Sequence, residues 1–213
     1  LQVTAVPIVS GYTYTWSTSP VQTGSVVTNL SAGLYSVNIK DANNCATSTT
    51  LNITQPIAPL TASLSNIINV ACYGNSTGGA TVSTSGGNAP YTYTWNTTPV
   101  QSNSIAANLS AGNYVVNIKD ANNCLINIPV TITQPATNVS AIISSQNNVS
   151  CFGGNNGSAS VLASGGVPAY TYTWNSVPTQ TTATANNLIA GTYTVIVKDA
   201  NNCSFSIQTT ITQ

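Results

Sequence analysis

The 213 residues include three basic side chains, three acidic side chains and no histidine, so charged residues make up only 3% of the chain. Soluble domains ordinarily have about a quarter of their residues charged, whereas the 42% of hydrophobic residues here suffices for packed cores. This balance excludes a basic surface for nucleic acid, and the lack of an apolar run of about 18 residues excludes a membrane-spanning helix in this segment.

The chain is an array of a unit that repeats every 79 residues. Cysteines recur at that spacing as Cys45, Cys124 and Cys203, and a second set recurs as Cys72 and Cys151. A fixed period of this size is typical of tandem domains. The recurring Ile-Thr-Gln sequence marks the joints, and a proline follows it twice.

Three domains follow from these joints. Residues 1–55 are expected to be the C-terminal part of a truncated first repeat, which begins within a strand at 1–6. Residues 56–134 are expected to form the second repeat, and residues 135–213 the third. The linkers are almost absent, so the repeats are expected to stack end to end with little swing.

Within repeat two, short runs of alternating polar and apolar residues follow one another. Strands are expected at 60–70, 80–85, 91–95, about 104–107, 114–119 and 125–133. Pro129 places the last of these at a sheet edge. Short strands with turn signals about every ten residues, and no helical period, predict an all-β fold of tandem immunoglobulin-like β-sandwich repeats.

One stretch of 16 residues, from Leu109 to Cys124 in repeat two, occurs in all three copies and holds every charge of the chain. Its opening Leu-x-Ala-Gly-x-Tyr predicts a tyrosine corner, a turn that brings a tyrosine to the start of a strand. The tyrosines are Tyr35, Tyr114 and Tyr193. Its closing Asp-Ala-Asn-Asn predicts a turn in which the aspartate accepts hydrogen bonds from nearby backbone amides. The aspartates are Asp41, Asp120 and Asp199.

A Tyr-Thr-Tyr-Thr-Trp strand precedes that stretch in each copy. Strict alternation places both tyrosines and the tryptophan on one face of the strand. We expect this face to pack in the core between two sheets. The tryptophans are Trp16, Trp95 and Trp174. An aromatic platform for sugars is the alternative, and a threonine-rich face for ice is a weaker one.

The cysteines predict an oxidised, extracellular protein. Each complete repeat has two cysteines 52 positions apart, which we pair as Cys72 with Cys124 and Cys151 with Cys203. Cys45 is expected to be unpaired by truncation, because its partner at that spacing would precede residue 1.

Few residues could carry chemistry. With no histidine and one carboxylate per repeat, the sequence offers no catalytic triad, carboxylate pair or zinc site. Calcium would need more than one carboxylate. We therefore expect no enzyme, no cofactor and no metal, although a catalytic domain elsewhere in a longer chain stays an alternative.

Two motifs together point to a family. Gly-Gly-x-x-Pro-Tyr-Thr-Tyr-Thr-Trp, followed by Asn-Leu-Ser-Ala-Gly-x-Tyr-x-Val-x-Ile-Lys-Asp-Ala-Asn-Asn-Cys, resembles the SprB-type repeat of Bacteroidetes gliding-motility and cell-surface adhesins. The resemblance covers about half of each unit. Repeat one lacks the Gly-Gly element, and repeat three has Pro168-Ala169 where repeat two has Ala89-Pro90.

This resemblance implies an extracellular location at the cell surface, in a filament exported by the type IX system and moved by the gliding machinery. The expected function is a repetitive stalk or adhesive segment that mediates attachment to surfaces. An array of carbohydrate-binding modules is the alternative. The expected partners are neighbouring repeats and, through the full-length protein, external surfaces or polysaccharide, but neither nucleic acid nor an inserted membrane.

Overall fold

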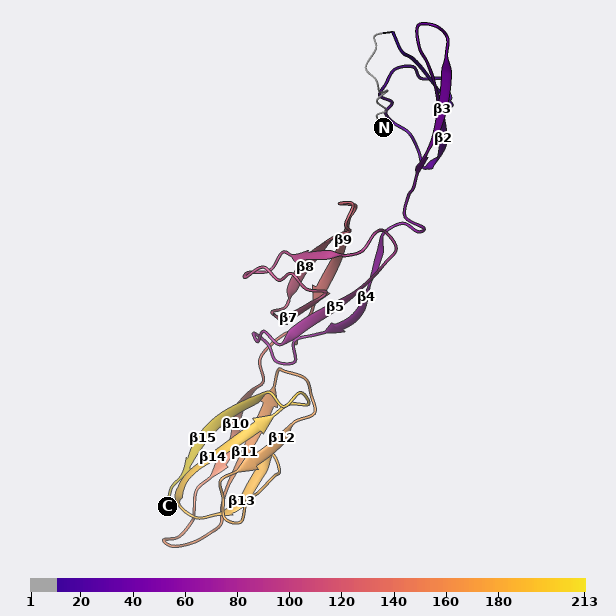
Figure 1. Cartoon of the computed structure of the whole chain (residues 1–213). Helices are drawn as coiled ribbons and strands as arrows, with labels where there is room; N and C mark the ends of the chain where they lie inside the picture. The colour runs from indigo at the N-terminus through magenta and orange to yellow at the C-terminus, as the bar shows by residue number, and fades with distance from the viewer. Residues whose placement is uncertain (1–10) are drawn as a thin grey trace. The chain divides into compact units, whose positions relative to one another are not determined.

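The computed structural model describes residues 11–213, so the strand expected at 1–6 lies outside the described residues. The chain divides into two compact units, Leu1–Pro59 and Leu60–Gln213. Between residues 11 and 59, the first unit has three antiparallel strands in the order β1-β2-β3, of which β2 and β3 are labelled in Figure 1. These strands are β1 (Thr13–Trp16), β2 (Gly33–Lys40) and β3 (Ala46–Ile53).

The second unit contains repeats two and three, each built of six strands. Those of repeat two are β4 (Thr61–Ile68), β5 (Gly78–Ser85), β6 (Thr92–Trp95), β7 (Ile105–Leu109), β8 (Gly112–Lys119) and β9 (Leu125–Ile132). Those of repeat three are β10 (Ser140–Asn147), β11 (Gly157–Ser164), β12 (Thr171–Trp174), β13 (Thr184–Leu188), β14 (Gly191–Lys198) and β15 (Ser204–Ile211).

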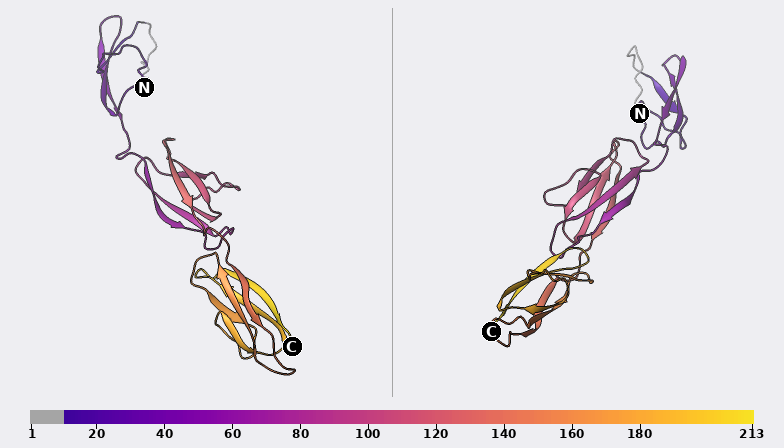
Figure 2. Two further views of the ribbon diagram at one scale, coloured as in Figure 1. Left: turned by 180° about the vertical axis from the view of Figure 1, so that it is seen from behind. Right: turned by 90° about the horizontal axis from the view of Figure 1, so that it is seen from below.

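Each of these repeats is a sandwich of two three-stranded antiparallel sheets. The sheets of repeat two have the orders β4-β5-β7 and β6-β8-β9, and repeat three has the same orders, β10-β11-β13 and β12-β14-β15. Figure 2 shows the strands of both repeats from two further sides. The first, second and fourth strands of a repeat form one sheet. The third, fifth and sixth strands form the other. The all-β, immunoglobulin-like fold expected from the sequence is confirmed.

Each repeat buries its own core. The tryptophan of the Tyr-Thr-Tyr-Thr-Trp strand lies at the centre in every copy, and Trp16, Trp95 and Trp174 are at most 1% exposed. In repeat two, Trp95 packs with residues of both sheets, among them Val82, Val116 and Val130. The core of repeat three uses the corresponding positions, between residues 139 and 211. Alternation along each strand explains this, because every second side chain points between the sheets.

The last strand of repeat two lies at an edge, as Pro129 predicted. β9 pairs only with β8, and Pro129 stands opposite Val115 in that register. Its apolar side chains at 126, 128, 130 and 132 are buried or half-buried, and the residues between them are exposed. A proline is tolerated there because an edge strand has one side without a backbone partner.

The predicted disulfides within single repeats are wrong. Neither Cys72–Cys124 nor Cys151–Cys203 forms; Cys72 instead bonds to Cys203 of the next repeat, with the two Cα atoms 5.6 Å apart. Cys45, Cys124 and Cys151 are free and exposed. The unpaired state expected of Cys45 is therefore found, but two further cysteines share it.

The reason is that the two cysteines of one repeat lie at opposite ends of its sandwich. Cys124 directly precedes the start of β9. Cys72 lies near the other end of β9, because the amide of Val70, two residues before it, donates to the carbonyl of Thr133. A strand of eight residues separates the two ends by roughly 27 Å. A disulfide needs Cα atoms only about 4.4–6.8 Å apart.

Candidate functional site

The candidate site is the joint between repeats two and three, where two short segments meet. One is the turn between β14 and β15, which carries Cys203. The other is the loop between β4 and β5, which carries Cys72. Each segment is held in shape by hydrogen bonds within its own repeat, and the same bonds recur in the other copies.

The aspartate organises the turn. In repeat two, Asp120 Oδ1 accepts hydrogen bonds from the amides of Asn122 (2.9 Å) and Cys124 (2.8 Å). The amide of Asn123, a residue with a positive φ of 63°, donates to the carbonyl of Asp120 at 3.0 Å. The same bonds to Asp199 Oδ1 position Asn201 and Cys203 at 2.9 Å each. The turn therefore presents its cysteine in a fixed geometry.

The second oxygen of this aspartate ties the turn to the Gly-Gly loop. Asp120 Oδ2 accepts from the amide of Asn88 at 3.0 Å, and Asp199 Oδ2 accepts from the amide of Val167 at 2.9 Å. Both aspartates are buried. In repeat one, Asp41 Oδ1 accepts hydrogen bonds from the amides of Asn43 and Cys45 in the same way, and the position equivalent to Asn88 lies outside the described residues.

Gly87 explains why this loop needs a glycine. Its φ is +60°, and a Cβ atom added to it would lie 2.7 Å from Asp120 Oδ2 and 3.1 Å from the Cβ of Leu60. We expect Gly87→Ala to lower the free energy of unfolding of repeat two by about 2–4 kcal/mol, through backbone strain and displacement of the carboxylate. Urea unfolding measures this loss.

Gly74→Ala is the matched control for that substitution. Gly74 also has a positive φ, +79°, but a Cβ atom there would meet nothing within 4 Å. The control should lose only the strain, about 1–2 kcal/mol. Equal losses in the two variants would contradict a role for the contact between the loop and Asp120.

Asp120 also makes the stability of repeat two depend on pH in the acidic range. Burial raises the pKa of its carboxyl group, but hydrogen bonds from the amides of Asn88, Cys124 and Asn122 outweigh this and lower the pKa below 3.8. A lowered pKa in the folded state stabilises the fold above the unfolded pKa, and this stabilisation disappears as the pH falls through the folded pKa.

We therefore expect the urea midpoint of repeat two to fall below about pH 4. Asp120→Asn should unfold at lower urea near neutral pH and lose less of its remaining stability on acidification. Urea titrations at several pH values measure both slopes. If the two proteins lost stability in parallel on acidification, Asp120 would not be the titrating group.

The loop with Cys72 is fixed from the joint sequence Ile-Thr-Gln. Gln134 Oε1 accepts the amide of Gly74 at 2.8 Å, and the amide of Asn75 donates to the carbonyl of Cys72 at 3.1 Å. In repeat three, Gln213 Oε1 accepts the amide of Gly153 at 3.1 Å. The recurring glutamine thus holds the cysteine loop at the end of each complete repeat.

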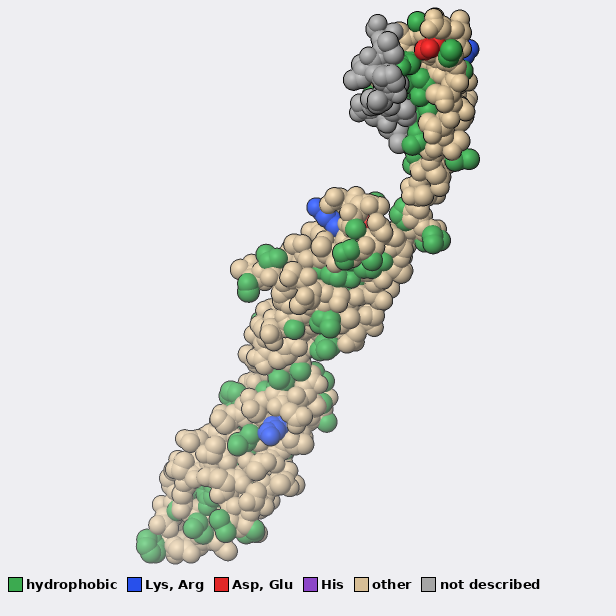
Figure 3. All heavy atoms as spheres, in the orientation of Figure 1, with side chains coloured by type: hydrophobic (Ala, Val, Ile, Leu, Met, Phe, Trp, Pro, Cys, Tyr) green, Lys and Arg blue, Asp and Glu red, His purple; other side chains and the backbone are tan. Residues whose placement is uncertain are grey.

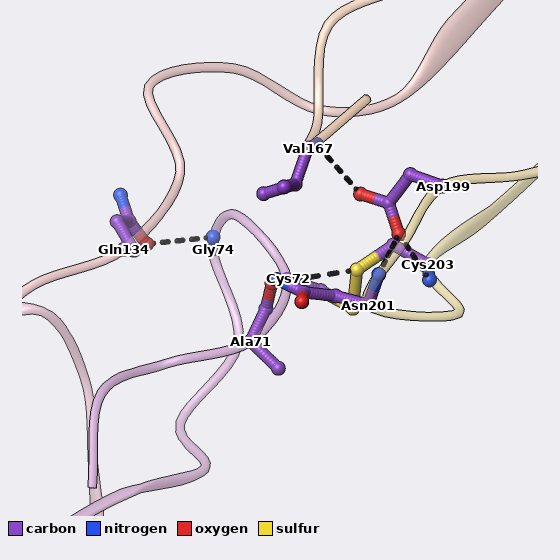
Figure 4. Close-up of a disulfide and its surroundings, with 8 residues drawn as sticks. All are labelled: Ala71, Cys72, Gly74, Gln134, Val167, Asp199, Asn201 and Cys203. Atoms are coloured by element: carbon purple, nitrogen blue, oxygen red, sulfur yellow. Dashed lines mark hydrogen bonds between the residues drawn. A yellow bond between two sulfur atoms is a disulfide. The ribbon is translucent and has the colours of Figure 1, made fainter. Parts of the chain in front are cut away.

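At the joint, the turn of repeat three meets the loop of repeat two. Figure 4 shows the Cys72–Cys203 disulfide beside two contacts with the carbonyl oxygen of Ala71. Asn201 Nδ2 donates to that oxygen at 2.8 Å, and Cys203 Sγ lies 3.5 Å from it. Both bonded cysteines are half-buried. A covalent bond and a hydrogen bond therefore fasten the two repeats to each other.

The sequence analysis missed the residues that support this joint, namely Gln134, Ala71 and Asn201. The glutamine was visible as part of the Ile-Thr-Gln repeat but was assigned only to a domain boundary. The sandwich topology offered a further signal. In an immunoglobulin-like fold, the first loop and the last turn lie at opposite ends, so they meet only between neighbouring domains.

The other predicted structural residues have defined partners. The phenol of each corner tyrosine donates to a carbonyl four residues upstream, as in Tyr114 to Ser110 at 3.1 Å. Tyr35 and Tyr193 make the same bond. Each tryptophan indole donates to a carbonyl, as in Trp95 to Asn103 at 2.9 Å. Burial of all three tryptophans leaves no tryptophan at the surface for stacking on a sugar.

The described surface is polar and carries few charges. Figure 3 shows isolated lysine and acidic side chains on surfaces that are otherwise mostly uncharged. The lysines at 40, 119 and 198 are exposed at the ends of their strands. Among residues 11–213, no three His, Cys, Asp or Glu side chains group together as a metal site requires.

Comparison with known families decides the nature of the repeat. The family model described as the SprB repeat matches residues 64–99 and 143–179. One stretch of each complete repeat is thus similar to the SprB repeat. The two matches lie in repeats two and three at corresponding places, from the first strand of each sandwich to the segment after its buried tryptophan. They support a repeat segment of the cell-surface adhesin type, located outside the cell or at its surface.

No curated protein matches the chain. Solved structures similar to this chain include the three N-terminal domains of the outer capsid protein Hoc of bacteriophage RB49, at 12% identity and a TM-score of 0.37, covering 98% of this chain and 89% of that one. The N-terminal eight Ig domains of Down Syndrome Cell Adhesion Molecule are 13% identical, with a TM-score of 0.40 and coverage of 97% and 32%.

A tetra-tandem repeat from the extending region of a large adhesion protein is 15% identical, with a TM-score of 0.28 and coverage of 94% and 66%. At such TM-scores the likeness carries no functional argument. The described part of the chain contains no helix that is long and apolar enough to cross a membrane.

Proposed function

We propose that this chain is a stalk segment of a large secreted adhesin, and that the adhesin is a filament of the gliding type that is exported by the type IX system and attaches the cell to external surfaces. The role is mechanical, without a reaction or a cofactor. The observation that carries this proposal is a covalently fastened tandem of SprB-type repeats.

The joint supports a role as a spacer that bears load. Each repeat has its own core, so stability is local to the repeat, as in other tandem arrays. The disulfide ties one sandwich to the next. If one repeat unfolds, the bond still limits how far the two repeats can move apart. A spacer also needs little specificity for a binding partner, and a surface almost without charge has little electrostatic preference for one partner over another.

The test follows the protein on living cells of its source. Antibodies raised to residues 60–213, the second compact unit, are coated on beads as Fab fragments, so that they do not crosslink neighbouring filaments. We expect the beads to bind and to travel along the cell surface. Beads coated with an unrelated Fab are the control and should not bind.

Two other outcomes have distinct meanings. Beads that bind and stay fixed would retain an adhesin stalk but contradict movement by a gliding motor. Beads that never bind, on cells shown by immunoblot to contain the protein, would contradict a surface location.

A further inference from the structure

We propose that the free end of repeat three is a docking site for another copy of this repeat. Its cysteine loop, residues 150–154, would take the Asp-Ala-Asn-Asn-Cys turn of the following copy and form a disulfide from Cys151. The partner is thus a repeat of this same type, and the joint between repeats two and three is one step of a regular series.

The first argument is that the free loop already has the shape of the occupied one. Gly153 has a φ of +72°, and its amide is held by Gln213, as Gly74 with a φ of +79° is held by Gln134. The amide of Gly154 donates to the carbonyl of Cys151 at 2.9 Å. In the occupied loop the same bond joins Asn75 to Cys72. The loop needs no rearrangement to receive a turn.

The second argument comes from exposure. In the occupied loop, Tyr73 follows the cysteine, is 43% exposed and lines a cavity of the joint together with Phe205, which lies in β15 just after the bound turn. Phe152 occupies the same place in the free loop and is 93% exposed. The thiol of Cys151 beside it is exposed as well. A turn bound at this loop would cover both groups.

The third argument is that the complementary half is preformed as well. The turn of repeat two, with exposed Cys124, has the hydrogen bonds of the bound turn of repeat three: Asp120 holds Cys124 at 2.8 Å, and Asp199 holds Cys203 at 2.9 Å. Asn123 and Asn202 share a φ of 63°. Both halves of the joint are therefore built into every complete repeat.

Formation of the bond is an oxidation of two thiols, and we name a small disulfide such as oxidised glutathione as the oxidant. The Cys151 thiolate attacks this disulfide and releases one small thiol. The thiolate of the following copy then attacks the mixed disulfide and releases the second small thiol. Two protein thiols become one disulfide, and one small disulfide becomes two thiols.

The test appends a second copy of residues 135–213 after Gln213, with the loop cysteine of that copy changed to serine, in a chain that also carries Cys45→Ser and Cys124→Ser. The protein is oxidised with glutathione, and its remaining thiols are alkylated. It is then digested with trypsin without reduction. Cleavage after the lysines at 119 and 198 separates Cys72, Cys151 and Cys203 onto three different peptides, and the appended turn cysteine lies on a fourth.

We expect two crosslinked peptides. One joins Cys72 to Cys203, and the other joins Cys151 to the turn cysteine of the appended copy. Changing that turn cysteine to serine should abolish only the second crosslink and leave Cys151 alkylated.

Three outcomes would overturn the proposal. In the first, Cys151 remains a free thiol while the Cys72–Cys203 crosslink forms. In the second, Cys151 bonds to Cys203 of its own repeat. In the third, the Cys72–Cys203 crosslink is itself absent, because the proposal extends that bond along the array. None of these outcomes depends on whether the adhesin moves.

Discussion

Stretched from its two ends to its full contour, the oxidised chain should remain about 450 Å shorter than the reduced chain. The disulfide joins residues 131 positions apart, and an extended chain spans at most about 3.3–3.6 Å per residue. Force applied at the ends passes from Cys72 directly to Cys203. The segment between them bears no load, even after it has unfolded.

Single-molecule force spectroscopy of the whole chain measures this difference as a contour length. Cys72→Ser should release the full length without any reductant. Cys151→Ser is the matched control, because Cys151 is a free cysteine at the corresponding position of the next repeat, and it should leave the short contour unchanged.

The same measurement separates the two pairings of the cysteines. If disulfides lay within the repeats, each would hide only 52 positions, and Cys124→Ser would lengthen the oxidised chain. The structure leaves Cys124 free, so Cys124→Ser should have no effect. A longer contour in that variant would contradict the joint described above.

Replacing Trp95 by alanine should have the largest effect on stability of any single core substitution in repeat two. Trp95 is fully buried and is the largest side chain of that core. Truncation of a buried tryptophan typically costs about 3–5 kcal/mol, and the carbonyl of Asn103 would also lose its donor. We expect repeat two to unfold at much lower denaturant concentrations.

Two spectroscopic signals show whether the loss is confined to one repeat. In Trp95→Ala the remaining tryptophans report on the other repeats, whereas circular dichroism reports on all strands. An early transition seen by circular dichroism but silent in tryptophan fluorescence is the expected result. A single shifted transition in both signals would mean that the repeats unfold as one unit.

Trp95→Phe and Trp174→Ala are the controls. The phenylalanine keeps an aromatic ring in the core and should lose less stability than the alanine. Trp174→Ala should place the early transition in repeat three, since its tryptophan is equally buried and donates to the carbonyl of Thr182 at 2.9 Å.

Local signals were enough for much of the fold. Strand alternation predicted that the aromatic strand packs its tryptophan in the core, and Pro129 predicted an edge strand. The Leu-x-Ala-Gly-x-Tyr sequence predicted the tyrosine corner. In each case the pattern extends over a few neighbouring residues, and the geometry of a single strand or turn decides where the side chains point.

The pairing of the cysteines was different. A period of 79 residues makes the spacing between the two cysteines of one repeat constant. It makes the spacing between cysteines of neighbouring repeats constant as well. Periodicity alone therefore could not distinguish Cys72–Cys124 from Cys72–Cys203. The distinction depends on which end of the sandwich each loop occupies, and that follows from how the strands are connected between the two sheets.

The sequence by itself determined an all-β tandem array with its core tryptophans and aspartate turns, because these features depend on local periodicity and hydrogen bonding. Only the tertiary structure decided that the disulfide fastens one repeat to the next. The eight residues of β9 keep Cys72 and Cys124 at opposite ends of one domain, and the joint between two domains brings Cys72 and Cys203 within bonding distance.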